Sequence, residues 1–178
     1  MKQVIQPETG FLIRAAEAAE HGLLGEITAR AYLDDGLLDF GEDDPYLASL
    51  RDVAARAAGA EVLVAAGADG EVLGGVTYAA GGTAWANVAG AGEAEFRMLA
   101  VASAARGRGV GKALVLACVE RARATEGCVR VRLSTHEKMR AAHRIYERLG
   151  FVRTPERDWA PYEELAPLLT YRLEIQGP

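Results

Sequence analysis

Hydrophobic and polar positions follow two periods along this chain, one typical of helices and one of strands. In residues 19–33 apolar side chains recur every three or four positions, at Leu23, Leu24 and Ile27 among others, which predicts an amphipathic helix. Asp44 followed by Pro45 matches an N-cap and a first helical position, and predicts a helix that continues to about residue 58. Similar patterns predict helices over residues 110–125 and 138–149.

Alternating positions and short apolar runs predict strands between these helices. The strands fall at residues 11–14, 61–66, 72–80, 93–101, 128–134, 151–152 and 168–175. Ala68-Asp69-Gly70 predicts a hairpin turn between the second and third of them. Because strands and helices alternate, we expect an α/β fold with a mixed sheet. We expect residues 1–178 to form a single domain whose folded core extends from Phe11 to Ile175.

Composition and charge exclude several classes of protein. Half of the 178 residues are hydrophobic and the net charge is −5, which is ordinary for a globular domain and does not suggest a nucleic-acid-binding protein. The charge fits a small cationic or neutral ligand better than a polyanion. No apolar run approaches the roughly 20 residues of a membrane span, and the first residues lack the apolar core of a signal peptide. We therefore expect a cytoplasmic protein without a membrane partner.

The cysteines and the spacing of possible metal ligands indicate neither a disulfide scaffold nor a metal site. Cys118 and Cys128 are too few for a disulfide scaffold and are expected to be buried free thiols. The three histidines and the carboxylates have neither zinc nor EF-hand spacing, so no metal is expected.

The segment Ala-Arg-Gly-Arg-Gly-Val-Gly-Lys at residues 105–112 lies between a predicted strand and a predicted helix. Glycines there expose backbone N–H groups, the helix start presents further unpaired N–H groups, and Arg106 and Arg108 add positive charge. Such a junction is suited to a phosphate or pyrophosphate.

Two common phosphate motifs do not fit this junction. A Walker loop would need glycine where Arg106 stands and a hydroxyl where Ala113 stands, and a dinucleotide fingerprint would need glycine in place of Lys112. What remains is the hexamer from Arg106 to Gly111, which has the form [QR]-x-x-G-x-[GA]. This hexamer resembles the acyl-CoA pyrophosphate loop of the GNAT superfamily of N-acetyltransferases.

The resemblance covers about residues 61–175 and extends to four segments in the family's order. Residues 95–101 resemble its central strand, 106–111 its pyrophosphate loop and 128–134 the following strand. Ala142, Tyr146, Gly150 and Phe151 match its A-x-x-x-Y-x-x-x-G-F signature. The chain departs from the family at Met139, where an asparagine often stands, so no hydrogen-bonding role is carried onto that side chain.

This resemblance implies a GNAT-like domain, with a mixed, mostly antiparallel sheet of six to seven strands flanked by about four helices. It implies an N-acetyltransferase that uses acetyl-CoA as co-substrate, without a metal, and transfers the acetyl group directly to a primary amine in a ternary complex. Backbone groups of three strand residues would pair with the pantetheine arm, and the loop would hold the pyrophosphate. The implied coenzyme-binding residues are Leu99, Ala100, Val101, Arg106, Gly107, Arg108, Gly109, Val110, Gly111 and Lys112.

Two residues are candidates for proton transfer. Tyr146 is expected to donate a proton to the departing thiolate, because a phenol pKa of about 10 keeps it neutral near a thiol of about 8.5; the alternative is a core aromatic on its helix. Glu95 is expected on a polar strand face near a wet cleft, as a base acting through water; the alternative is an exposed strand residue. Ser134 stands where other members place a carboxylate and cannot serve as a comparable base.

The acceptor is the least determined part. Tyr32 and the acidic residues of 34–44 could line a pocket for a cation or form a solvated loop, and Trp159 could flank the acceptor or anchor packing. Two other functions remain open: a non-catalytic acyl-CoA sensor, and an enzyme that acetylates a protein N-terminus or lysine. The expected partner is a small-molecule or peptide amine, and a homodimer is left open.

Overall fold

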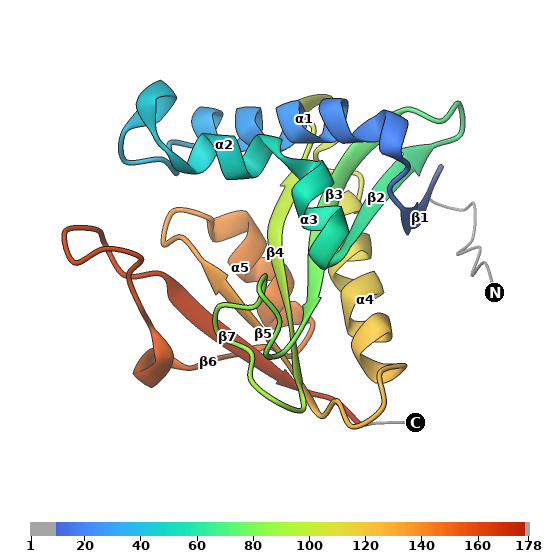
Figure 1. Cartoon of the computed structure of the whole chain (residues 1–178). Helices are drawn as coiled ribbons and strands as arrows, with labels where there is room; N and C mark the ends of the chain where they lie inside the picture. Colours follow the sequence, from blue (N-terminus) through green and yellow to red (C-terminus); the bar gives the residue numbers. More distant parts are fainter. Residues whose placement is uncertain (1–9, 177–178) are drawn as a thin grey trace.

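A seven-stranded sheet runs through the molecule, and helices lie against both of its faces (Figure 1). The computed structural model describes residues 10–176; the expectation about a signal peptide concerns residues 1–9, outside this range. The strand order is β1-β2-β3-β4-β5-β7-β6, and every neighbouring pair is antiparallel except β4–β5. The strands are β1 (Phe11–Ala15), β2 (Glu61–Gly67), β3 (Val72–Ala80), β4 (Glu93–Val101), β5 (Arg130–Thr135), β6 (Val152–Arg153) and β7 (Leu169–Glu174).

The helices confirm the predicted α/β class with one correction. They are α1 (His21–Asp34), α2 (Tyr46–Arg51), α3 (Val53–Gly59), α4 (Val110–Arg123) and α5 (Arg140–Arg148). The single helix predicted from Pro45 to about residue 58 is wrong, because the chain breaks at Asp52 into α2 and α3. The Asp52 carboxylate accepts the backbone N–H of Ala55 at 3.0 Å, so this side chain caps a new helix instead of continuing the old one. Other predicted boundaries agree to within about two residues.

The pattern of β2 explains why both faces of the sheet are covered. Leu63 and Ala65 belong to the core under α4, whereas Val62 and Val64 pack with Leu24 of α1. Successive side chains of a strand point to opposite faces, so this uninterrupted apolar run requires a helix layer on each side. Within residues 10–176, no helix combines the length and the apolar character that crossing a membrane would require.

Strands β4 and β5 are joined at one end and separate at the other. Their parallel register covers only Glu93 to Glu95 of β4, opposite Arg130 to Arg132. At this joined end Glu93 accepts from Arg130 at 2.9 Å and from Arg132 at 2.6 Å. Beyond Glu95 the two strands diverge, which leaves one edge of β4 without a strand partner.

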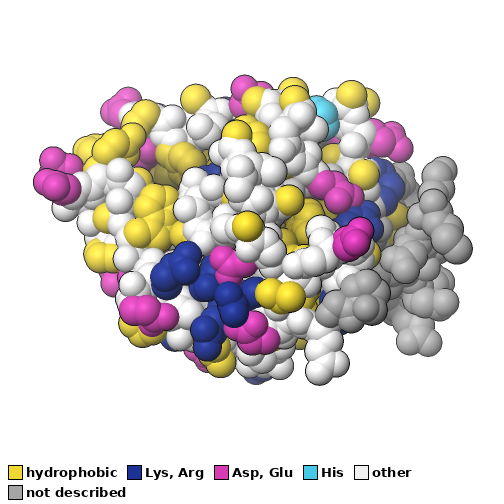
Figure 2. All heavy atoms as spheres, turned by 60° about the horizontal axis from the view of Figure 1, so that its bottom comes forward, with side chains coloured by type: hydrophobic (Ala, Val, Ile, Leu, Met, Phe, Trp, Pro, Cys, Tyr) yellow, Lys and Arg dark blue, Asp and Glu magenta, His cyan; other side chains and the backbone are white. Residues whose placement is uncertain are grey.

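The joined end carries charge of both signs. Arg130 also donates to Glu174 of β7 at 2.7 Å, so ion pairs connect three adjacent strands. Figure 2, which brings this lower end forward, shows basic and acidic side chains mixed within one cluster. The ion pairs hold the strands together at the end opposite their opening.

Candidate active site

The loop before α4 has the backbone form of an anion-binding turn. Gly107 and Gly109 adopt left-handed conformations, with φ of 78° and 80°, which glycine adopts without the steric cost of a Cβ. Gly109 is the N-cap of α4, and a Cβ at this position would meet no atom within 4 Å. The first N–H groups of a 14-residue helix and its positive dipole end lie at this turn.

A cavity of about 690 Å³, here called the larger cavity, lies beside this loop. It extends from the free edge of β4 to α5, and its lining includes every predicted coenzyme-binding residue except Arg108. The predicted coenzyme-binding residues that line this cavity are Leu99, Ala100, Val101, Arg106, Gly107, Gly109, Val110, Gly111 and Lys112. The sequence reasoning missed three further cations in its lining, Lys138, Arg140 and Arg148. These basic residues recur just before α5 and along it, and this recurrence is the sequence signal that could have identified them.

The two arginines of the loop have different surroundings. Arg108 does not line the larger cavity, and one of its terminal nitrogens would lie 3.9 Å from a Cβ built on Gly10, next to β1. Arg106 lines the cavity and donates two hydrogen bonds to Asp35, at 3.2 and 3.0 Å. The carboxylate of Asp35, at the end of α1, therefore binds the guanidinium of Arg106, which the sequence analysis expects to bind a pyrophosphate.

Strand β4 contains a bulge between the loop and its joined end. Thr77 of β3 pairs with Arg97 but Gly75 pairs with Ala100, so β4 has one extra residue. Met98 lies there with φ of 55°, the one positive φ at a non-glycine residue among residues 10–176. Such backbone strain at a bulge is typical of functional sites, where it changes the direction of neighbouring groups.

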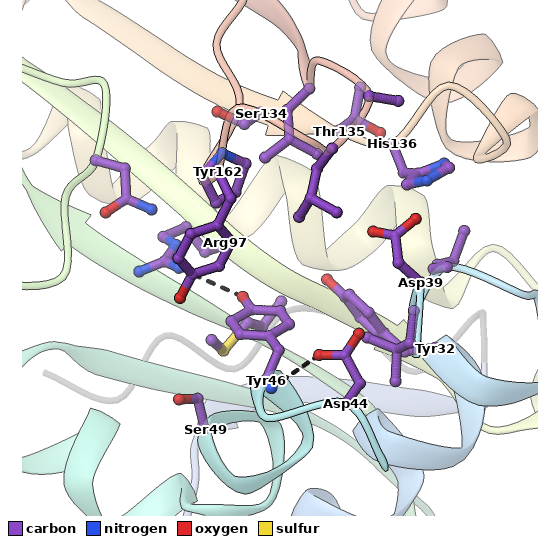
Figure 3. A pocket seen from close by; sticks show the side chains of 18 of the residues that line it. Tyr32, Asp39, Asp44, Tyr46, Ser49, Arg97, Ser134, Thr135, His136 and Tyr162 are labelled. Atoms are coloured by element: carbon purple, nitrogen blue, oxygen red, sulfur yellow. Dashed lines mark hydrogen bonds between the residues drawn. The ribbon is translucent and has the colours of Figure 1, made fainter. Parts of the chain in front are cut away.

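A second cavity, of about 360 Å³, lies next to the first and is here called the smaller cavity. The two share Tyr32, Leu37 and Met139 in their linings, so they meet at this wall. The polar groups that line the smaller cavity come from six separate segments, one of which is α1 with Tyr32 (Figure 3). They include Asp39, Asp44, Tyr46, Ser49, Asn87, Arg97, Ser134, Thr135, His136 and Tyr162.

The structure distributes the predicted acceptor residues unevenly. Asp44 and Trp159 line the smaller cavity, Asp35 lines the larger one, and Tyr32 lines both. Asp44 uses both carboxylate oxygens internally, accepting Tyr46 N–H at 2.9 Å and Phe40 N–H at 3.3 Å. Trp159 donates its indole N–H to Ser134 at 2.9 Å, which fixes the ring beside the cavity.

Glu95 is not in the partly solvated position expected for it, and that expectation is wrong. The residue is 0% exposed and lines neither cavity. Its Oε1 accepts the backbone N–H groups of Val88 at 2.7 Å and Ala89 at 3.0 Å, because the 81–92 loop covers this face of β4. Its Oε2 has no hydrogen-bond partner in the described part of the chain and lies 4.0 Å from Nε of Arg97.

Tyr146 lies in an aromatic cluster on the sheet side of α5. Its ring centroid is 5.8 Å from those of Phe96 and Tyr171 and 5.9 Å from that of Phe151. Desolvation by burial raises the pKa of its phenol above the ordinary value, with a smaller effect from Cys118. Tyr146 does not line either cavity, although its helix neighbours Ala142 and Ile145 line the larger one. Its role in proton transfer stays a prediction.

No metal centre is apparent in the part of the chain that the structure describes. Among residues 10–176 no group of three or more His, Cys, Asp or Glu is placed to hold a metal ion. Cys118 and Cys128 are buried free thiols, as expected.

Comparison with known proteins identifies the class of molecule that combines this fold with this loop. The profile of the acetyltransferase (GNAT) family matches residues 25–151. The chain therefore belongs to this family, and it is an acyltransferase. No curated protein sequence matches it significantly.

Solved structures share the fold over nearly the whole chain. An acetyltransferase from Corynebacterium glutamicum, described as histone acetyltransferase and related acetyltransferase, is 23% identical with a TM-score of 0.71, covering 95% of this chain and 98% of that one. A putative acetyltransferase from Salmonella typhimurium, solved with its cofactor acetyl-CoA, is 23% identical with a TM-score of 0.67, covering 94% and 95%. A phosphinothricin acetyltransferase from Sinorhizobium meliloti in complex with acetyl-CoA is 19% identical with a TM-score of 0.67, covering 93% and 89%.

Proposed function

We propose that the chain transfers an acetyl group from acetyl-CoA to a primary amine by direct attack in a ternary complex. The observation that carries this proposal is the larger cavity, which brings the glycine loop, the start of α4 and the free edge of β4 to one site. Two of the similar structures contain acetyl-CoA, which supports the choice of co-substrate.

The charge of the larger cavity favours a polyanionic ligand. Its lining includes Arg106, Lys112, Lys138, Arg140 and Arg148 and a single carboxylate, that of Asp35. Backbone N–H groups at the start of α4 would bind the pyrophosphate, and these cations would neutralise it. Lys138 donates to Gly36 O at 3.4 Å, so it also connects α5 to the end of α1.

The free edge of β4 would bind the pantetheine arm. Leu99, Ala100 and Val101 line the larger cavity on the stretch where β5 no longer pairs with β4. An unpaired strand edge offers alternating N–H and C=O groups to an extended ligand. An N–H group in this stretch would polarise the thioester carbonyl and stabilise the oxyanion.

The acceptor amine would approach from the smaller cavity, across the wall at Tyr32, Leu37 and Met139. Its nitrogen forms a bond to the carbonyl carbon, the carbon–sulfur bond breaks, and the electron pair leaves with sulfur. Tyr146 would donate a proton to that thiolate. Because Glu95 is buried and lines neither cavity, the amine proton would reach it only through a water that enters beside Arg97, which does line the smaller cavity. Oε2 is the oxygen of Glu95 that is left for this role, because Oε1 already accepts two N–H groups.

The fold alone does not identify the acceptor. Descriptions of the similar structures include a histone acetyltransferase, a phosphinothricin acetyltransferase and a ribosomal-protein-alanine N-acetyltransferase. Their identities to this chain are 23%, 19% and 22%, too low for any of these acceptors to be carried over.

A thiol-release assay tests the proposal. Acetyl-CoA is incubated with amines, polyamines, aminoglycosides and peptides, and initial rates are measured while both substrates vary. Intersecting double-reciprocal lines support direct transfer, whereas parallel lines indicate a covalent acetyl-enzyme. Tight acetyl-CoA binding without turnover on any amine would favour an acyl-CoA sensor, and turnover on peptides alone would favour a protein-modifying enzyme.

A further inference from the structure

The smaller cavity has a guanidinium in its wall that the sequence analysis did not single out. Arg97 lies on β4 immediately before the bulge, and its side chain is 17% exposed. Figure 3 shows the head group directed toward Tyr46 inside the cavity. A cation that is mostly removed from water at a ligand-sized cavity requires compensation.

The protein supplies this compensation only in part, through hydrogen bonds and through the Trp85 ring, whose centroid lies 6.0 Å from the guanidinium carbon of Arg97. Arg97 donates to the backbone O of Trp85 at 3.1 Å and to the hydroxyl of Tyr46 at 3.4 Å. Nε lies 4.0 Å from Glu95 Oε2, beyond hydrogen-bond distance. A guanidinium has five N–H donors, so three find no acceptor within residues 10–176.

A second guanidinium makes this end of the cavity more positive. Arg56 is 1% exposed and donates to Thr77 Oγ1 at 3.1 Å and to the backbone O of Ser49 and of Leu50 at 2.7 and 2.8 Å. Thr77 is the cross-strand partner of Arg97, which places the two cations side by side. Among residues 10–176, the ion pair of Arg97 is that with Glu95 at 4.0 Å, and Arg56 forms none although Asp52 lies near enough to act on its charge, so the local charge favours an anion.

The rest of the cavity has a different character. Asp39 lies beside Tyr32, across the cavity from Arg97 (Figure 3), and forms no hydrogen bond or ion pair among residues 10–176. Tyr32 belongs to the wall shared with the larger cavity, so the acidic side is the one nearer the thioester. Apolar and aromatic side chains fill the space between. They are Leu38, Phe40, Met98, Trp159, Leu165 and Leu168.

We propose that the acceptor is an amine that also carries an anionic group, in the simplest case an apolar amino acid whose carboxylate binds Arg97. The carboxylate accepts two N–H groups of the guanidinium in a fork, and the amine faces the shared wall. The apolar side chain packs on the aromatic lining. This inference rests on the proposed acetyl transfer, whose site it extends.

Matched pairs of acceptors test the proposal on the unmodified protein. Phenylalanine, leucine and methionine are each compared with the amine that lacks only the carboxylate, alongside spermidine as a cationic acceptor. We expect kcat/KM for at least one amino acid to exceed that of its decarboxylated partner by about 10- to 100-fold, as for a hydrogen-bonded charge pair. Equal or better turnover of the decarboxylated amines, or of spermidine alone, would overturn it.

Variants assign the preference to one side chain. Arg97→Gln should remove the advantage of the amino acid, mainly through KM, and should leave the decarboxylated partner within about twofold. Arg144→Gln is the matched control, because Arg144 is exposed and lines neither cavity. Equal losses on both members of a pair would contradict the assignment. If Arg97→Gln does not fold, Arg97→Lys keeps the charge without the fork and should show an intermediate preference.

Calorimetry separates this inference from the proposed function. Binding of acetyl-CoA, together with neither binding nor acetylation of any amino acid in the panel, would overturn the inference alone. Absence of acetyl-CoA binding would overturn the acetyl transfer, while amino-acid binding that is lost in Arg97→Gln would still support the anion site.

Discussion

The two cavities that meet at Tyr32, Leu37 and Met139 are built in different ways. The larger one is formed mainly by residues 99–112 and 138–149, and its specific groups are backbone N–H groups, glycines and a strand edge. The smaller one collects side chains from α1, the 37–49 segment, Asn87, β4, the 134–139 segment and the 159–168 segment. A site made of backbone needs a fixed local sequence, whereas a site made of distant side chains can change while the fold is kept.

This difference separates what the backbone of the loop requires from what individual side chains decide. Glycines suit the left-handed backbone at residues 107 and 109, so this turn depends on its local sequence. Arg97 obeys no such requirement, since any side chain can stand at an alternating strand position. The proposed coenzyme side therefore depends on a local motif, whereas the proposed acceptor side depends on side chains that can differ between proteins of one fold.

The largest expected effect would come from closing the backbone site. Gly109→Glu should weaken acetyl-CoA binding by at least about 100-fold, because a carboxylate would occupy the approach of the pyrophosphate and repel it. The fold should survive, since the left-handed conformation costs a non-glycine residue only about 1–2 kcal/mol. Calorimetric titration of the folded variant measures the affinity.

Gly70→Glu is the matched control for Gly109→Glu. Gly70 also has a positive φ, of 84°, and open space at its Cβ, but it lies in the β2–β3 hairpin and lines neither cavity. The Gly70→Glu variant has the same backbone strain and added charge as Gly109→Glu, but the new side chain does not face the proposed acetyl-CoA site. Unchanged affinity in Gly109→Glu would mean that the loop does not hold the pyrophosphate.

A second prediction concerns the hydroxyl of Tyr146. Tyr146→Phe should lower turnover by about 10- to 1000-fold, the range for a positioned acid, with little change in acetyl-CoA affinity. No hydrogen bond to this hydroxyl is found within residues 10–176, so the packing of Phe96 and Phe151 on the ring should persist.

Tyr171→Phe separates acid chemistry from packing. Tyr171 belongs to the same aromatic cluster, and its hydroxyl donates to Glu147 at 3.3 Å. If both variants lose turnover equally, the effect belongs to the cluster and Tyr146 is a core residue. The steady-state rate and the melting temperature of both variants decide this.

A third prediction tests the proton-accepting role of Glu95 through a pH–rate profile. Glu95→Gln should depress the rate by about 10- to 100-fold at neutral pH and by much less near pH 10, where an amine of pKa about 10 is already partly deprotonated. Glu93→Gln is the control, because Glu93 is the other carboxylate of β4 and its ion pairs lie at the joined end. A uniform loss at every pH would make Glu95 a residue that positions Arg97 and the 81–92 loop.

The sequence was sufficient for the sheet, most helices and the glycine turn before α4, because each depends on local chemistry. Hydrophobic periodicity identified both faces of β2, and the glycine spacing identified the turn before α4. It failed at Asp52, where a side-chain cap interrupts a good helical pattern. It also failed for the burial of Glu95, which depends on two N–H groups from a loop whose path over the sheet no local pattern specifies. Arg97 was missed for the same reason, since its cavity exists only after six segments meet.

The smallest expected effect tests whether a change of charge at the end of α1 alters acetyl-CoA binding in the larger cavity. Asp35 holds Arg106 at the larger cavity, and its charge opposes a pyrophosphate there. Asp35→Asn should therefore tighten acetyl-CoA binding by about two- to fivefold at low salt, the scale of an exposed ion pair, and less at high salt because ions screen it. Asp34→Asn is the control, since Asp34 pairs with Arg30 at 3.6 Å and lines neither cavity. Weaker binding in Asp35→Asn at both salt concentrations would instead mean that Asp35 holds Arg106 in the position that the pyrophosphate needs, and the backbone site would then depend on a side chain from the end of α1.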